Sequence, residues 1–152
     1  MQNEIKHTWY FNQPLQEIWE YLTVPHLLGQ WLMECDFKPT VGHKFRFTCS
    51  NTTDCEVLQV DPYKKLVYSW QAPSAKGGKV FTSTVTWTLT PKADGTQLQL
   101  VHSGFTLLED LLGHDQGWIA CGNKLTELST AATGPISTSA VKPAAAATTN
   151  EK

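Results

Sequence analysis

The spacing of apolar and polar positions changes along the chain, and each spacing predicts one kind of element. Residues 4–11 form a β-branched and aromatic run, which predicts a first strand. The next apolar residues share one helical face, and they are Leu15, Ile18, Trp19 and Leu22. Pro25 predicts the end of this short helix, and a second short helix is expected from His26 to Leu32.

From Cys35 to Phe105 the period becomes two, which is typical of strands with one buried face. In the clearest run, threonines alternate with Phe81, Ser83, Val85, Trp87 and Leu89. Turn signals separate the runs, at Val41-Gly42, Asp61-Pro62, Gly77-Gly78 and residues 93–95. Strands joined by such short turns form antiparallel hairpins, so we expect an antiparallel sheet of about six to seven strands.

A last helix is expected from about His114 or Asp115 to Thr130, with Asp115 as its N-cap. Its apolar stripe consists of Trp118, Cys121, Leu125 and Leu128. A helix of this length spans roughly 24 Å, which is enough to cross several strands. The order of elements therefore predicts an α+β fold in which a curved antiparallel sheet wraps around one long C-terminal helix.

The composition changes after Thr130. Residues 131–152 are mainly Ala, Thr, Ser and Pro and contain no aromatic residue. Such a segment buries too little apolar surface to offset the entropy of ordering. We therefore expect one folded domain over residues 1–130 and a disordered tail over residues 131–152.

Charge and cysteine content narrow the function classes. The net charge is -2 and the basic residues are scattered, which disfavours nucleic acid as a partner. No run is apolar enough for membrane insertion, and the first residues lack a secretory signal pattern, so a cytoplasmic location is expected. The four cysteines, which we expect to be reduced, show no metal-binding spacing, and no cofactor motif is present.

Several short motifs follow one another in an order that resembles a known family. They are residues 5–11 followed by Pro14, Glu17, Ile18 and Trp19; Trp31; residues 41–45; residues 57–62 leading to residues 66–70; residues 85–89; residues 98–105; and Gly117-Trp118. The sequence resembles the family named for activators of the ATPase of the 90-kDa heat-shock protein, within the START-like (SRPBCC) helix-grip superfamily. The resemblance covers essentially residues 4–130.

The resemblance implies a deep, mostly apolar cavity between the curved sheet and the last helix. Members of the superfamily use such cavities for lipids, polyketides and similar molecules, and a minority catalyse cyclase-type reactions. Eukaryotic chaperone activators carry a separate N-terminal domain, for which this sequence has no room, so the family name alone does not define the function. This chain departs at Val41-Gly42, where members often carry paired glycines.

Ten residues on the faces expected to point inward are candidates for lining the cavity: Trp31, Phe47, Tyr68, Trp70, Trp87, Leu100, His102, Trp118, Cys121 and Leu125. For any single one, simple core packing is the commoner role. The number of tryptophans nevertheless favours a pocket in which indole rings stack on a flat ligand and their N–H groups orient it.

His102, Cys121 and the acidic segment before the last helix each have two interpretations. His102 is either a polar anchor of the pocket or a buried histidine satisfied by its neighbours. Cys121 is either a reactive thiol facing a ligand or a small buried side chain. Glu109, Asp110, His114 and Asp115 are expected in a connecting loop, as a gate for the cavity mouth or as solvated charges.

Three functions follow from these observations. The first is a non-enzymatic binding protein, monomeric or weakly dimeric, for a small hydrophobic or aromatic ligand such as a lipid or polyketide. The second is an interaction module that acts on a chaperone in a stress response. The third is a cyclase or hydrolase that uses His102, although no nucleophile–base pair is visible in the sequence.

Overall fold

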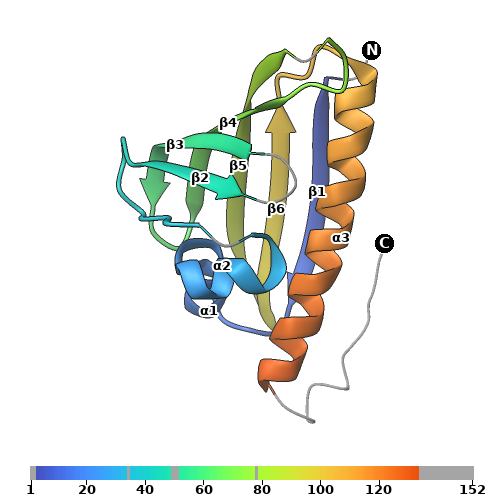
Figure 1. The fold of residues 1–152 in the computed structure, drawn as a ribbon. Coiled ribbons are helices and arrows are strands. Elements are labelled where there is room, and N and C mark those ends of the chain that lie inside the picture. Colours follow the sequence, from blue (N-terminus) through green and yellow to red (C-terminus); the bar gives the residue numbers. More distant parts are fainter. Residues whose placement is uncertain (1–2, 34, 49–51, 78, 134–152) are drawn as a thin grey trace.

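The computed structural model describes residues 3–33, 35–48, 52–77 and 79–133, and these ranges form one sheet and three helices (Figure 1). The first strand, β1 (Glu4–Phe11), leads into two short helices, α1 (Leu15–Thr23) and α2 (Pro25–Trp31). Five strands follow: β2 (Lys44–Thr48), β3 (Thr52–Asp61), β4 (Lys65–Pro73), β5 (Val80–Lys92) and β6 (Gly95–Ser103). The chain then enters the long helix α3 (Leu108–Thr133). This confirms the predicted α+β helix-grip architecture.

All neighbouring strands are antiparallel, in the order β1-β6-β5-β4-β3-β2. Strands β2 to β6 are therefore successive neighbours along the chain. The N-terminal strand β1 lies at the far edge beside β6, with Glu4 opposite Ser103. The register places Trp70 of β4 opposite Ser83, and Val85 of β5 opposite His102.

One face of the sheet is buried, as the alternating pattern predicts. In β5 the side chains of Ser83, Val85 and Trp87 are buried, whereas the threonines between them remain partly exposed. The same alternation runs through β4 and β6. The period of two thus arises because successive side chains of a strand point to opposite faces.

Helix α3 lies along the buried face and packs against β1 and α2, while α1 and α2 lie near one end of the sheet (Figure 1). Gly122 permits the closest approach, because a Cβ atom at this position would overlap the indole ring of Trp9. Two hydrogen bonds lie on either side of this contact along α3. One joins His7 Nε2 and Asp115 Oδ1 at 2.6 Å, and in the other Gln13 Nε2, from the segment after β1, donates to Ser129 O at 2.8 Å.

The predicted start of the last helix is wrong. Helix α3 begins at Leu108 rather than at His114 or Asp115, so Glu109, Asp110 and His114 are helical and do not form a connecting loop. Asp115 is not an N-cap; its carboxylate contacts His7 instead. The prediction missed the first turns because Gly113, which has low helix propensity, separates them from the apolar stripe of the rest of the helix.

Helix α3 also continues to Thr133, three residues beyond the predicted domain boundary at residue 130. The rest of the predicted tail, residues 134–152, lies outside the described residues. Within the described ranges, none of the helices combines the length and the apolar character needed to cross a lipid bilayer.

Candidate functional site

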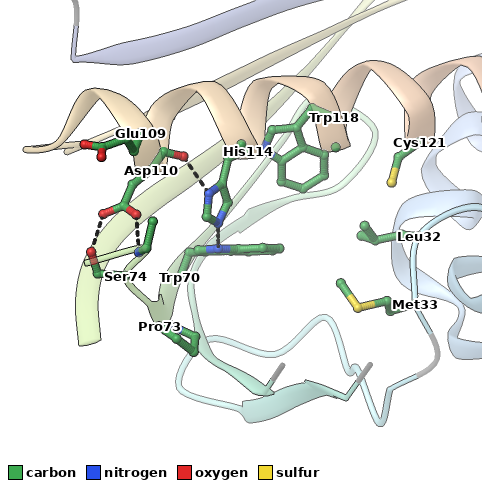
Figure 2. Close-up of a pocket in the computed structure, with 13 residues that line it drawn as sticks. Leu32, Met33, Trp70, Pro73, Ser74, Glu109, Asp110, His114, Trp118 and Cys121 are labelled. Atoms are coloured by element: carbon green, nitrogen blue, oxygen red, sulfur yellow. Dashed lines mark hydrogen bonds between the residues drawn. The ribbon is translucent and has the colours of Figure 1, made fainter. Parts of the chain in front are cut away.

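A pocket of about 410 Å³ lies beneath the N-terminal half of α3. Figure 2 shows α3 along one side of it, Trp70 and Pro73 from β4 on another, and Leu32 and Met33, which follow α2, facing them. Its lining consists of Leu32, Met33, Trp70, Pro73, Ser74, Ala75, Glu109, Asp110, Gly113, His114, Gly117, Trp118 and Cys121. The volume falls within the range of about 300–1,000 Å³ that is typical of small-molecule sites.

Two glycines of α3 keep this pocket open. Gly113 and Gly117 stand four residues apart and therefore share one face of the helix. A Cβ atom added at either position would have no atom within 4 Å among its non-local neighbours. Gly122 lets the helix contact Trp9, whereas Gly113 and Gly117 leave space that no other side chain fills.

The carboxylate of Asp110 connects α3 to the end of β4. Ser74 Oγ donates to Asp110 Oδ2 at 2.7 Å, and the backbone N–H of Ala75 donates to Asp110 Oδ1 at 2.7 Å. The residue is only 5% exposed, so both bonds are shielded from water. Hydrogen bonds to a charged acceptor are among the stronger ones in proteins, and this pair fixes the distance between two walls of the pocket.

His114 orients Trp70 in the opposite wall. Trp70 Nε1–H donates to His114 Nε2 at 3.2 Å, and His114 Nδ1 lies 2.8 Å from Asp110 O. Because the indole can only donate, Nε2 must accept, and Nδ1 therefore carries the ring proton and donates it to the backbone carbonyl. Both imidazole nitrogens are used within the protein when the ring is neutral.

His102 lies behind the pocket in a sealed hydrogen-bond chain. Trp118 Nε1–H donates to His102 Nδ1 at 2.9 Å, so Nε2 carries the proton and donates it to Ser83 Oγ at 2.7 Å. Ser83 Oγ in turn donates to Trp70 O at 3.2 Å. The imidazole is 0% exposed, and burial, with a smaller contribution from His114, lowers the pKa of His102 to about 3. The ring is therefore neutral near pH 7.

Burial also favours the uncharged forms of two thiols and one phenol. Burial raises the pKa of the Cys121 thiol and of the Cys55 thiol, so neither is a ready thiolate. Burial likewise raises the pKa of Tyr68, whose hydroxyl accepts a hydrogen bond from Trp87 Nε1 at 2.9 Å. Cys55 and Cys121 are free thiols, and Cys49 lies outside the described residues.

Three of the ten candidate residues line the pocket: Trp70, Trp118 and Cys121. The other seven are buried in the core beside it, namely Trp31, Phe47, Tyr68, Trp87, Leu100, His102 and Leu125. All four indoles of the set donate to protein acceptors; the remaining one, Trp31 Nε1, donates to Tyr21 O at 2.9 Å. Their N–H groups are thus engaged within the protein.

Sequence reasoning missed most of the remaining lining. The two glycines had a usable signal, because glycine inside a helical segment often marks a close approach or an opening. Leu32 and Met33 had no such signal, since they lie just beyond a helix and face the pocket only through the tertiary arrangement. In the part of the chain that the structure describes, no cluster of His, Cys, Asp and Glu side chains could hold a metal ion.

The sequence and the fold were compared with those of known proteins. A sequence profile described as "Activator of Hsp90 ATPase homolog 1-like protein" matches residues 12–130. No curated protein matches the chain significantly. Among solved structures, protein MLL2253 from Mesorhizobium loti is 37% identical with a TM-score of 0.77, and the match covers 82% of this chain and 95% of that one.

Two more distant structures share the fold. DynU16, a protein of the dynemicin biosynthetic locus, is 23% identical with a TM-score of 0.75, over 88% of this chain and 49% of that one. The Aha1 dimer from Colwellia psychrerythraea is 19% identical with a TM-score of 0.68, over 83% of this chain and 95% of that one.

Proposed function

The chain belongs to the Activator of Hsp90 ATPase homolog 1-like family, and on that premise we propose that it is a non-catalytic protein that binds a small apolar molecule beneath α3. The observation that carries this proposal is the pocket of about 410 Å³, with Trp70, Trp118, Met33 and Leu32 among its walls. Small-molecule sites are mostly apolar and contain a few placed polar groups. The pocket has this composition, and Gly113 and Gly117 keep it open from the helix side.

The arrangement of His102 supports binding rather than catalysis. A serine lies 2.7 Å from the imidazole, which resembles a nucleophile and its base. The direction of the proton argues against that role, because His102 Nε2 donates to Ser83 and has no lone pair with which to activate it. His102 is also absent from the pocket lining. The neutral, fully bonded ring is best explained as a structural group that fixes Trp118 and Trp70.

The fold neighbours are compatible with small-molecule binding. DynU16 is a protein of a biosynthetic locus, and it shares this fold across most of the present chain. The family description also names activation of the Hsp90 ATPase, which remains the competing function. An ATPase assay of that chaperone with and without this protein addresses it, and an unchanged rate removes this alternative.

The pocket hypothesis is tested with the neutral fluorescent probe N-phenyl-1-naphthylamine, whose emission rises in apolar surroundings. We expect the wild-type protein to bind it and Gly117→Leu to weaken binding by roughly tenfold or more, since the new side chain fills the cavity. Ala120→Leu is the matched control, because it places the same side chain on α3 at a position that does not line the pocket. Absence of binding to the wild type, or equal binding by Gly117→Leu, would contradict the proposal.

A further inference from the structure

The side chains that line the pocket use their hydrogen-bond donors within the protein. The indole N–H of Trp70 goes to His114, and that of Trp118 goes to His102. The hydroxyl of Ser74 goes to Asp110. Only the Cys121 thiol remains, and a thiol is a weak donor. Side-chain donors of useful strength are therefore not available to a ligand.

Acceptors remain available in the same walls. An ionised carboxylate offers about four lone-pair sites. Asp110 has two of them occupied, by Ser74 Oγ and by the N–H of Ala75. Glu109 lies 3.2 Å from Lys76 Nζ in an exposed ion pair, which is a weak interaction and leaves the second carboxylate oxygen to solvent or to a ligand. The hydrogen-bonding capacity of the pocket is thus mainly that of an acceptor.

The charge of the lining also favours a ligand that donates hydrogen bonds. Among the described residues that line the pocket, Glu109 and Asp110 are acidic and none is Lys or Arg. The positive end of the α3 dipole lies nearby, but these two carboxylates occupy the first turn and already complement it. Lys76 lies outside the lining and is already paired with Glu109. A ligand carboxylate in this pocket would therefore lose its water without gaining a cationic partner from the lining, and an unpaired buried charge is strongly unfavourable.

We propose that the pocket selects its ligand by donor and charge, and takes a flat aromatic molecule that carries an amine or hydroxyl donor while excluding carboxylates such as free fatty acids. The aromatic ring lies beside Trp70 and Met33, over the bare helix backbone at Gly113 and Gly117. The donor group faces Asp110, at the end of the pocket where Figure 2 shows this carboxylate with Ser74. This inference rests on the proposed function, since it assumes that the pocket binds small molecules.

The test uses four naphthalenes that differ in one substituent at the 2-position. They are 2-naphthylmethylammonium, 2-naphthalenemethanol, 2-methylnaphthalene and 2-naphthoate, each titrated by calorimetry and by displacement of N-phenyl-1-naphthylamine. We expect the ammonium and the alcohol to bind more tightly than the methyl compound. We expect 2-naphthoate to bind roughly tenfold or more weakly than the alcohol, because charge repulsion acts only on the anion.

Two variants assign the cause. Asp110→Asn removes one negative charge, while its amide can still accept from Ala75 N–H and can donate to Ser74 Oγ. We expect it to narrow the ammonium-to-naphthoate affinity ratio roughly fivefold. Glu127→Gln removes a charge from an exposed position of α3 outside the pocket and should leave that ratio unchanged.

The outcomes separate the two proposals. One outcome is that all four naphthalenes bind, that Gly117→Leu weakens their binding, and that 2-naphthoate binds as tightly as the ammonium compound. This outcome overturns the selection by donor and charge but leaves the binding function standing. The same holds if 1-decanol or decanoate binds in the pocket while the naphthalenes do not. A charge preference that persists in Asp110→Asn combined with Glu109→Gln also overturns the assigned cause. No binding of any probe removes both proposals.

Discussion

The two halves of α3 meet the rest of the molecule in opposite ways. In the C-terminal half, Gly122 has the indole of Trp9 against its backbone, so the missing side chain brings helix and strand together. In the N-terminal half, Gly113 and Gly117 have open space where the Cβ atom of another residue would stand. A helical glycine can thus close a contact or preserve a cavity, and only the opposite wall distinguishes the two cases.

The two histidine–indole pairs show the same contrast. Trp118 donates to His102 inside the core, whereas Trp70 donates to His114 on the wall of the pocket. His102 is fully buried, and His114 is half-buried beside the cavity. Both indoles line the pocket, so the difference lies in the acceptor: His102 is enclosed in the core, whereas His114 itself forms part of the pocket wall.

The largest expected effect concerns the buried side chain of His102 and depends on pH. The neutral state of His102 is required in the fold, where its pKa is about 3, whereas an unfolded histidine titrates near 6.5. The unfolded chain therefore binds this proton first, and the stability contribution that is complete above pH 6.5 is lost as pH falls toward 3. Across the roughly 3.5 pH units between these two pKa values, the loss in the free energy of unfolding reaches up to about 5 kcal/mol.

Urea unfolding of the wild type and of His102→Gln across this pH range measures the effect. The variant cannot titrate at residue 102, so the difference in unfolding free energy between the two proteins isolates the term. The difference should shrink as pH falls. Parallel pH profiles would show that His102 is not held neutral by the fold.

A smaller effect is expected where Trp9 meets Gly122. Gly122→Ala should lower the free energy of unfolding by about 2 kcal/mol, because the added methyl overlaps a rigid indole and overpacking outweighs the gain in helix propensity. Thermal and urea unfolding followed by circular dichroism measure this change. A stabilised variant would mean that α3 and β1 are less closely packed than the structure indicates.

The smallest expected effect is a stabilisation, and it concerns the two glycines beside the pocket. Gly113→Ala and Gly117→Ala should each raise the free energy of unfolding by about 0.5–1 kcal/mol, since alanine is the better helix former and nothing blocks its methyl group. The same unfolding experiments apply, with Gly122→Ala as the contrasting substitution. If all three substitutions change stability in the same direction, the two halves of α3 do not differ as described.

The sheet could be predicted from the sequence because its pattern is local. The alternation in β5 follows from the pleat of a single strand, and β1 was predicted with its observed bounds, Glu4–Phe11. The start of α3 could not be predicted in this way. Its first turns hold two glycines and several polar residues, and they are helical in a setting where Asp110 contacts the end of β4, from a distant part of the chain.

The site was less predictable than the fold. Trp70 and Trp87 both occupy inward positions of period two, yet Trp70 lines the pocket and Trp87 lies within the core. Trp118 of α3 lies about equally close to both rings, with centroid distances of 5.3 Å to Trp70 and 5.5 Å to Trp87. What separates the two rings is the rest of their surroundings, since Trp87 also packs against Trp9 and Trp31, and these neighbours are a tertiary property. The sequence could identify the inward side chains, but not which of them would have empty space beside them.

The pairing of β1 with β6 has a consequence for how the molecule is made. Among the described strands, β1 is synthesised before the other five, yet its sheet neighbour is the last of them, β6, with Glu4 opposite Ser103. Until β6 has left the ribosome, β1 has no partner for its backbone groups, and contacts so distant in sequence form slowly. During synthesis the aromatic-rich strand β1 therefore stays unpaired while the roughly ninety residues up to β6 are made, and the nascent chain depends on rapid closure of the sheet or on protection from aggregation.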